Sequence, residues 1–115
     1  LGMHFVKVEP QEVIAKMIVR KSLGAWNGYL HAGAVVSLAD TCCGYGTVRG
    51  LPTGAIGFTT IELKSNFLGT AKEGLLRCEA VGEHLGRTTQ VWSATVFNAQ
   101  GKKRALFRCT QMILA

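Results

Sequence analysis

One aspartate conflicts with the segment that carries it. The stretch NGYLHAGAVVSLAD runs from Asn27 to Asp40, opens with small and polar residues, and then becomes almost entirely aliphatic. A carboxylate on such a segment is costly to bury unless it is paired, hydrogen-bonded or used in function. Asp40 is therefore the first candidate for a functional residue. The alternative is a structural carboxylate whose oxygens are satisfied by helix ends or hydroxyl groups.

The cysteines are a second group of side chains that could take part in chemistry. Cys42 and Cys43 are adjacent within an apolar stretch, Cys78 and Cys109 are isolated, and the chain has no CxxC pair. An even number of cysteines permits two disulfide bridges in principle. We expect instead four free, buried thiols in a reducing cytoplasm, and neither a metal site nor a disulfide framework.

The basic residues raise the question of a polyanionic partner. The formal net charge is +6, and only the segment GKKRA at residues 101–105 forms a cluster, which resembles a hairpin turn. The charge indicates either a solvated surface or attraction to phosphates, on nucleic acid or on a nucleotide-bearing small molecule. Aromatic residues make up 8% of the chain and do not interleave with the basic ones, which argues against nucleic acid. The basic residues of the second half are Lys64, Lys72, Arg77, Arg87, Lys102, Lys103, Arg104 and Arg108.

Length and composition limit the architecture. The 115 residues, of which 48% are hydrophobic, predict one domain over residues 1–115 with a substantial core. No apolar run approaches the roughly 20 residues that span a bilayer, and no basic-then-apolar leader opens the chain. We therefore expect no membrane partner.

The elements that position Asp40 follow from hydrophobic periodicity. Alternation predicts strands at residues 3–10 and 12–20, with a tight turn at Pro10–Gln11. In the second strand it places Val13, Ala15, Met17 and Val19 on one face. From His31 to about Val48 the alternation vanishes, and apolar or small residues on all sides predict a helix that is buried on most sides.

The remainder of the chain predicts sheet. Four further strand segments are expected at residues 57–69, 74–86, 87–101 and 104–115, separated by turns. Alternation places Thr60, Glu62, Lys64 and Asn66 on one face of the first of these segments. It places Gln90, Trp92, Ala94 and Val96 on one face of the third. About six strands with one helix after the second strand predict an α+β fold. An antiparallel sheet wrapped around one central apolar helix explains why the helix needs no polar face.

This order of elements, with the motif around Asp40 at the helix, resembles the hotdog-fold thioesterases. Within them the chain is similar to the phenylacetate-degradation-type acyl-CoA thioesterases, relatives of 4-hydroxybenzoyl-CoA thioesterase. Their signature is G-x-x-H-G-G followed by an aliphatic run that ends in L-A-D or L-A-E. Here Gly28, His31 and Gly33 match the first part, and Leu38, Ala39 and Asp40 match the second. The resemblance continues through TTIELKSNFL and HLGRTTQVW and covers nearly the whole chain.

The resemblance implies a reaction and an assembly. Members of the family act as homodimers, commonly as dimers of dimers, and bind the acyl thioester at the dimer interface. Backbone N–H groups at a helix N-terminus stabilise the developing oxyanion, and the Ala32 N–H corresponds to that donor. Asp40 of the partner subunit's helix is then the base that activates water or the nucleophile that attacks the thioester.

The resemblance also assigns roles to residues outside the helix. His31 lines the site and supports the first helical turn, or is a histidine bonded to backbone only. The family's Asn or Gln six residues before the histidine, which orients water or the carbonyl, is Ala25 here. Either Asn27 takes that role through a different loop path, or the role is missing. Thr60 or its neighbour Thr59 helps to position water, but their side chains point to opposite faces of a strand.

A last group of residues is expected to contact the substrate. Gly33 belongs to the helix motif and Phe67 shapes an acyl pocket, although core packing explains Phe67 equally well. The segment of Gly86, Arg87 and Thr88 corresponds to one that contacts the coenzyme A nucleotide, and Arg87 offers a forked donor for phosphate. A plain hairpin end has the same composition.

We therefore expect a cytoplasmic acyl-CoA thioesterase that hydrolyses a small aryl- or acyl-CoA without a cofactor. Two other functions remain open for a hotdog domain. One is a hydratase or dehydratase acting on acyl thioesters, and the other is a non-catalytic module that binds acyl-CoA.

Overall fold

The computed structural model describes residues 3–19, 32–69 and 74–115. The described part contains, in chain order, β1 (Met3–Val8), β2 (Glu12–Val19), α1 (Ala32–Arg49), β3 (Gly57–Phe67), β4 (Gly74–Leu85), β5 (Thr89–Phe97) and β6 (Lys103–Leu114). The prediction of six strands and one helix after the second strand is confirmed. The helix ends at Arg49, one residue beyond the predicted end.

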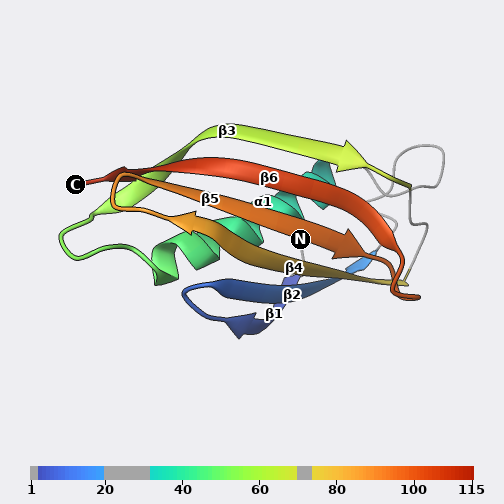
Figure 1. Cartoon of the computed structure of the whole chain (residues 1–115). Helices are drawn as coiled ribbons and strands as arrows, with labels where there is room; N and C mark the ends of the chain where they lie inside the picture. The colour runs from blue at the N-terminus through green and yellow to red at the C-terminus, as the bar shows by residue number, and fades with distance from the viewer. Residues whose placement is uncertain (1–2, 20–31, 70–73) are drawn as a thin grey trace.

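The described strands form one antiparallel sheet in the order β1-β2-β4-β5-β6-β3. Helix α1 contacts all six strands and lies behind the sheet in the view of Figure 1. One helix covering one face of a curved antiparallel sheet is the predicted α+β architecture. Within the described part of the chain, β1 and β3 are the edges of this sheet.

Successive side chains of a strand point to opposite faces of the sheet. Because apolar and polar residues alternate along the strands, one face of the sheet is apolar, and α1 covers that face. The inward-facing residues of β2 and β5 are buried, as predicted: Val13, Ala15 and Met17, and Gln90, Trp92, Ala94 and Val96. Apolar residues dominate this face, so its burial supplies the main favourable term in folding.

Helix α1 is buried on its sheet-facing side but not all round. Leu38, Cys42 and Cys43 have no exposed surface, whereas Tyr45 is 49% and Val48 is 58% exposed. The prediction of a helix buried on most sides is confirmed, with an exception at the exposed outward residues. Its apolar composition includes an outward stripe that this chain alone does not cover.

Trp92 sets how closely α1 approaches the sheet. Its fully buried indole ring lies against Gly46, and a methyl group on Gly46 would overlap the ring. The indole Nε1–H donates to Gln90 Oε1 at 2.8 Å, and Gln90 Nε2 donates to the carbonyl of Gly50 at 3.3 Å. Carbonyls at the end of a helix lack intrahelical partners, so this bond ties the C-terminal end of α1 to β5.

The edge strand β3 departs from strict alternation. Its register against β6 shifts between Thr60, which pairs with Gln111, and Glu62, which pairs with Thr110. This bulge at Ile61 places Thr60 and Leu63 on the inner face, and the predicted alternation of Thr60 with Glu62, Lys64 and Asn66 on one face is therefore wrong.

The close contact between Gly46 and Trp92 predicts that Gly46→Ala is destabilising. Overpacking of a full core typically costs about 1–3 kcal/mol, although alanine has the higher helix propensity. Gly44→Ala is the matched control on the same helix, because a methyl group there would lie 3.5 Å from Phe58, an ordinary contact. Denaturant unfolding should show a loss for Gly46→Ala only. Equal stability of the two variants would contradict this packing.

Candidate active site

Asp40 lies in an open hollow between α1 and the edge of the sheet. The hollow has a volume of about 280 Å³. Spacings of one, four, five and eight residues from Asp40 place side chains on one stripe of a helix. The residues that line it are Asp40, Thr41, Gly44, Tyr45 and Val48 of α1 with Phe58, Thr60 and Gln111 of the sheet.

The environment of Asp40 disfavours its charge. The side chain is partly buried beside Val48, Tyr45 and Phe58, and this burial raises the pKa of the Asp40 carboxyl. A carboxylate made more basic in a partly apolar hollow suits a general base toward water, or a nucleophile.

A buried hydrogen-bond chain connects the hollow to the helix. The Thr60 hydroxyl and Gln111 Oε1 are 2.6 Å apart, Gln111 Nε2 is 3.4 Å from Thr47 Oγ1, and Thr47 Oγ1 is 2.8 Å from the Cys43 carbonyl. Gln111 and Thr47 have no exposed surface. Sequence reasoning missed Gln111, although a glutamine at an inward position of β6 carries the same signal as Asp40: a polar residue in an apolar pattern.

Register decides between the two adjacent threonines. Thr60 pairs with Gln111 on the inner face and lines the hollow. Thr59 pairs with Met112 and is exposed. Of the two threonines expected to position water or contact the substrate, Thr59 therefore lies on the outer face, away from the hollow.

Tyr45 forms an aromatic wall of the hollow. Its ring stacks on Phe5 of β1, with ring centroids 4.3 Å apart and an angle of 7° between the planes. Phe58 lines the hollow at the start of β3, whereas Phe67, the predicted acyl-pocket residue, lies at the other end of that strand and is 50% exposed.

Several predicted site residues lie at or beyond the described ranges. Asn27 and His31 fall within residues 20–31, outside the described part of the chain. Ala32 is the first residue of α1, as the predicted oxyanion donor requires, and Gly33 is exposed in the first turn.

Gly86, Arg87 and Thr88 form the turn between β4 and β5. The Gly86 N–H donates to the Thr89 carbonyl at 2.9 Å, and a Cβ on Gly86 would come within 2.6 Å of His84 Nε2. Glycine at this position therefore has a structural reason. Arg87 is exposed, so its guanidinium is accessible to a ligand phosphate.

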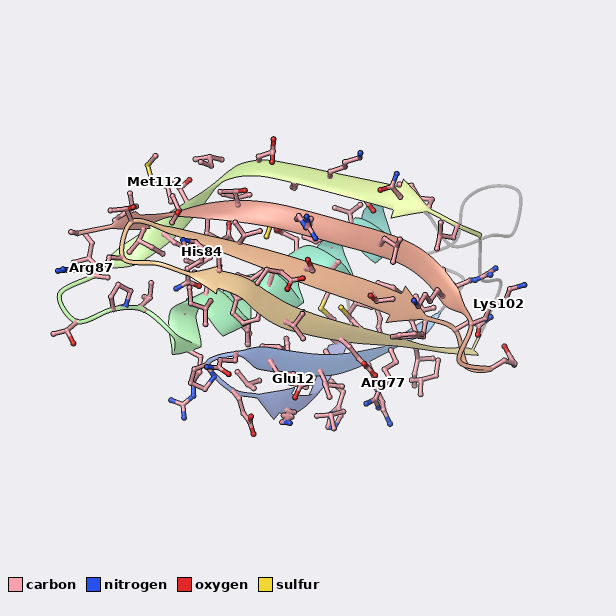
Figure 2. The ribbon with its side chains drawn as sticks, viewed as in Figure 1. Glu12, Arg77, His84, Arg87, Lys102 and Met112 are labelled. Atoms are coloured by element: carbon pink, nitrogen blue, oxygen red, sulfur yellow. The ribbon has the colours of Figure 1, made fainter. Side chains whose placement is uncertain are left out.

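The described basic residues are spread over the molecule. Figure 2 shows Arg87 and Lys102 at opposite ends of the sheet. Arg77 pairs with Glu79 at 2.7 Å, and Arg108 lies 4.0 Å from Glu83. This dispersal agrees with the predicted solvated surface more than with a continuous nucleic-acid groove.

All four cysteines are free and buried, as predicted. Hydrogen bonding to Cys109, followed by burial, raises the pKa of Cys43, and hydrogen bonding to Cys42, followed by burial, raises the pKa of Cys78. Both effects keep these thiols protonated and unreactive. Within the described residues, no helix combines the length and hydrophobicity needed to cross a bilayer.

Comparison with known proteins shows that the chain is similar to thioesterases. A family model described as the thioesterase superfamily matches residues 27–105. A 1,4-dihydroxy-2-naphthoyl-CoA hydrolase of Listeria monocytogenes is 29% identical over 110 residues, covering 96% of this chain and 89% of the relative.

Solved structures agree with the fold. A thioesterase of Staphylococcus aureus superposes with a TM-score of 0.93 at 28% identity, covering 98% of this chain and 93% of that one. A thioesterase of Pseudomonas aeruginosa gives a TM-score of 0.92 at 29% identity, with 99% and 82% covered. The predicted hotdog fold is thereby confirmed.

The burial of Asp40 predicts that Asp40→Asn stabilises the folded protein at neutral pH. The folded-state pKa lies above the unfolded value, so the stability contributed by the neutral carboxyl is complete below about pH 3.9 and is lost as pH rises through the folded pKa. Asparagine does not ionise, so the variant keeps this stability as the pH rises. The Tm of the variant should exceed that of the wild type by a few degrees near neutral pH and converge with it in acid.

Glu83→Gln is the matched control, because it removes one negative charge from an exposed position on β4, which is not an edge strand. Its Tm should follow the wild type across the pH range. If Asp40→Asn melts at or below the wild-type temperature at neutral pH, the carboxylate is stabilised by its surroundings and this account of the site is wrong.

Proposed function

The chain belongs to the thioesterase superfamily, and from this premise we propose that it hydrolyses a small aryl- or acyl-CoA to the free acid and coenzyme A. The observation that carries the proposal is Asp40, a carboxylate with a raised pKa in a partly apolar hollow. The relative from Listeria monocytogenes, named for hydrolysis of an aryl-CoA, supports this substrate class. The L-A-D ending of the helix motif supports the phenylacetate-degradation-type branch.

The proposed reaction needs water, a base and an oxyanion donor. Asp40 takes a proton from water while the water oxygen bonds to the thioester carbonyl carbon. The C–S bond then breaks, and the thiolate leaves and is protonated. Little acid assistance is required because a thiol is far more acidic than an alcohol, with a pKa near 8.5 for the cysteine side chain. Direct attack by the Asp40 carboxylate, followed by hydrolysis of the anhydride, is the alternative route.

The oxyanion donor of the proposal is the start of α1. Backbone N–H groups of a first helical turn have no intrahelical acceptor and carry the positive end of the helix dipole. The Ala32 N–H is our candidate, with His31 and Asn27 as predicted neighbours. No cofactor enters this scheme.

The proposed active unit is a homodimer, with pairs of dimers forming a tetramer. Strand β3 is a sheet edge with hydrophobic side chains: Ile61 is 52% and Leu63 is 47% exposed, and Ile56, directly before the strand, is 80% exposed. Such an edge tends to pair with another strand. Pairing of two β3 edges would bring the exposed stripe of α1 against its copy, so that each Asp40 faces the helix N-terminus of the partner subunit.

Two further assignments complete the proposal. Arg87 in the β4–β5 turn is placed to bind phosphate of the coenzyme A moiety, with the Gly86 and Thr88 backbone beside it. The four free thiols favour a reducing compartment, and we assign the enzyme to the cytoplasm.

Thiol release from a panel of aryl- and acyl-CoAs tests the reaction. We expect turnover by the wild type and a loss of about 100-fold or more in kcat for Asp40→Asn, in line with removal of a general base. The kcat/KM of the wild type should rise with pH, with a midpoint above the ordinary aspartate value near 3.9. Glu83→Gln, on the inner strand β4 and away from the proposed seam, is the control for loss of charge.

Other outcomes separate the remaining functions. Undiminished turnover by Asp40→Asn removes Asp40 from the mechanism. Binding of acyl-CoA without thiol release favours a non-catalytic module, and hydration of an enoyl-CoA favours a hydratase.

Assembly is tested by placing a charge on the edge strand. Ile61→Lys should give a monomer in analytical ultracentrifugation and lose most turnover, because the site is completed by the second chain. Ile18→Lys is the matched control, since Ile18 is 56% exposed on β2, at the other side of the sheet. A wild-type monomer with full turnover would contradict the shared site.

A further inference from the structure

We propose that Gln111 is a positioning residue, which fixes the Thr60 hydroxyl so that it accepts a hydrogen bond from the attacking water. The inference rests on the proposed function, because it concerns the water that Asp40 activates. Neither Gln111 nor the direction of the Thr60 proton follows from the motif at the helix.

The Cys43 carbonyl fixes the direction of the chain. A carbonyl oxygen only accepts hydrogen bonds, so the Thr47 hydroxyl at 2.8 Å is the donor. A hydroxyl has a single proton. Thr47 Oγ1 therefore meets Gln111 as an acceptor.

Gln111 is oriented by that acceptor. Only its amide nitrogen can donate, so Nε2 faces Thr47 and Oε1 faces the hollow. Gln111 is fully buried, and a buried amide left without partners would cost about 1–3 kcal/mol. The reverse orientation would place Oε1 against a Thr47 oxygen whose proton is already committed to Cys43.

Thr60 must then donate to Gln111. Its hydroxyl lies 2.6 Å from Gln111 Oε1, a short distance for a hydrogen bond between two oxygens. Because its single proton is used there, the Thr60 oxygen presents only lone pairs to the hollow that it shares with Asp40.

Two acceptors in one hollow orient a water molecule. A water between Asp40 and Thr60 directs one proton to the carboxylate and the other to the Thr60 oxygen, which leaves an oxygen lone pair for the thioester carbon. This arrangement favours Asp40 as a base toward water over direct attack by the carboxylate. Orienting a reactant in this way lowers the barrier without contributing a reacting group.

The same constraint preserves the base strength of Asp40. A hydroxyl that donated to the carboxylate would stabilise its charge and lower its pKa. Burial is instead the cause of the raised pKa of Asp40, and the Thr60 proton is engaged elsewhere.

A double-mutant cycle with thiol release as readout tests the inference. Gln111→Met removes the amide at similar length, and Thr60→Val removes the hydroxyl at similar shape. We expect each single variant to lose about 10–100-fold in kcat with little change in KM, as for misplacement of a reactant. The double variant should lose no more than Thr60→Val alone, because Gln111 acts only through Thr60. Thr60→Ser should retain most of the turnover.

Gln90→Met is the matched control. Gln90 is the other fully buried glutamine of the described residues and is paired with Gln111 across β5 and β6, but its hydrogen bonds go to Gly50 and Trp92. It should lower the Tm and leave kcat near the wild-type value. If Gln111→Met does not fold, Thr47→Val tests the same chain, with a kcat loss that disappears in the Thr60→Val background.

The outcomes separate a failure of the role inferred for Gln111 from a failure of the proposed function. If wild type hydrolyses acyl-CoA but Gln111→Met lowers kcat by the same factor with and without the Thr60 hydroxyl, Gln111 does not act through Thr60 and the inference fails. If the wild type releases no thiol from any acyl-CoA, the proposed function fails and the inference falls with it.

Discussion

The seating of one apolar helix against one face of a curved sheet is the constraint on which the structure depends. Helix α1 contacts every strand, and its sheet-facing side carries the small or fully buried residues Leu38, Cys42, Cys43 and Gly46. The opposite stripe carries Asp40, Tyr45 and Val48. One side of α1 therefore contributes to the core and the opposite side to the candidate site. A change in the distance of α1 from the sheet, or in its rotation, alters both.

Much of this could be predicted from the sequence because the patterns are strong. Period-two alternation identified the inner faces of β2 and β5, and the loss of alternation identified α1. Asp40 was found because a carboxylate contradicts its apolar surroundings. The prediction that α1 is buried on most sides holds, but the sequence did not mark the exposed residues Tyr45 and Val48, because their apolar character matches that of the core. A second chain is proposed to cover them.

The remaining details depend on register, which alternation alone does not reveal. A single residue inserted at Ile61 changes which side chains of β3 face inward, and no residue type marks the bulge. The choice of Thr60 over Thr59, and its meeting with Gln111 some 50 residues along the chain, follow from pairing with β6. Gln111 carried a visible signal, but its partners are distant in sequence.

The two buried glutamines show how the fold combines rigidity with chemistry. They lie opposite each other on β5 and β6. Gln90 contacts the carbonyl of Gly50, directly after α1, and Gln111 contacts the hydroxyl of Thr47 within α1. Trp92 meanwhile limits the approach of the helix at Gly46. Because these contacts bracket the C-terminal half of α1, the distance between helix and sheet is fixed on both sides of Thr47. The hollow at Asp40 lies beside the same part of the helix. The packing of the core therefore determines how precisely a water molecule can be positioned in the hollow.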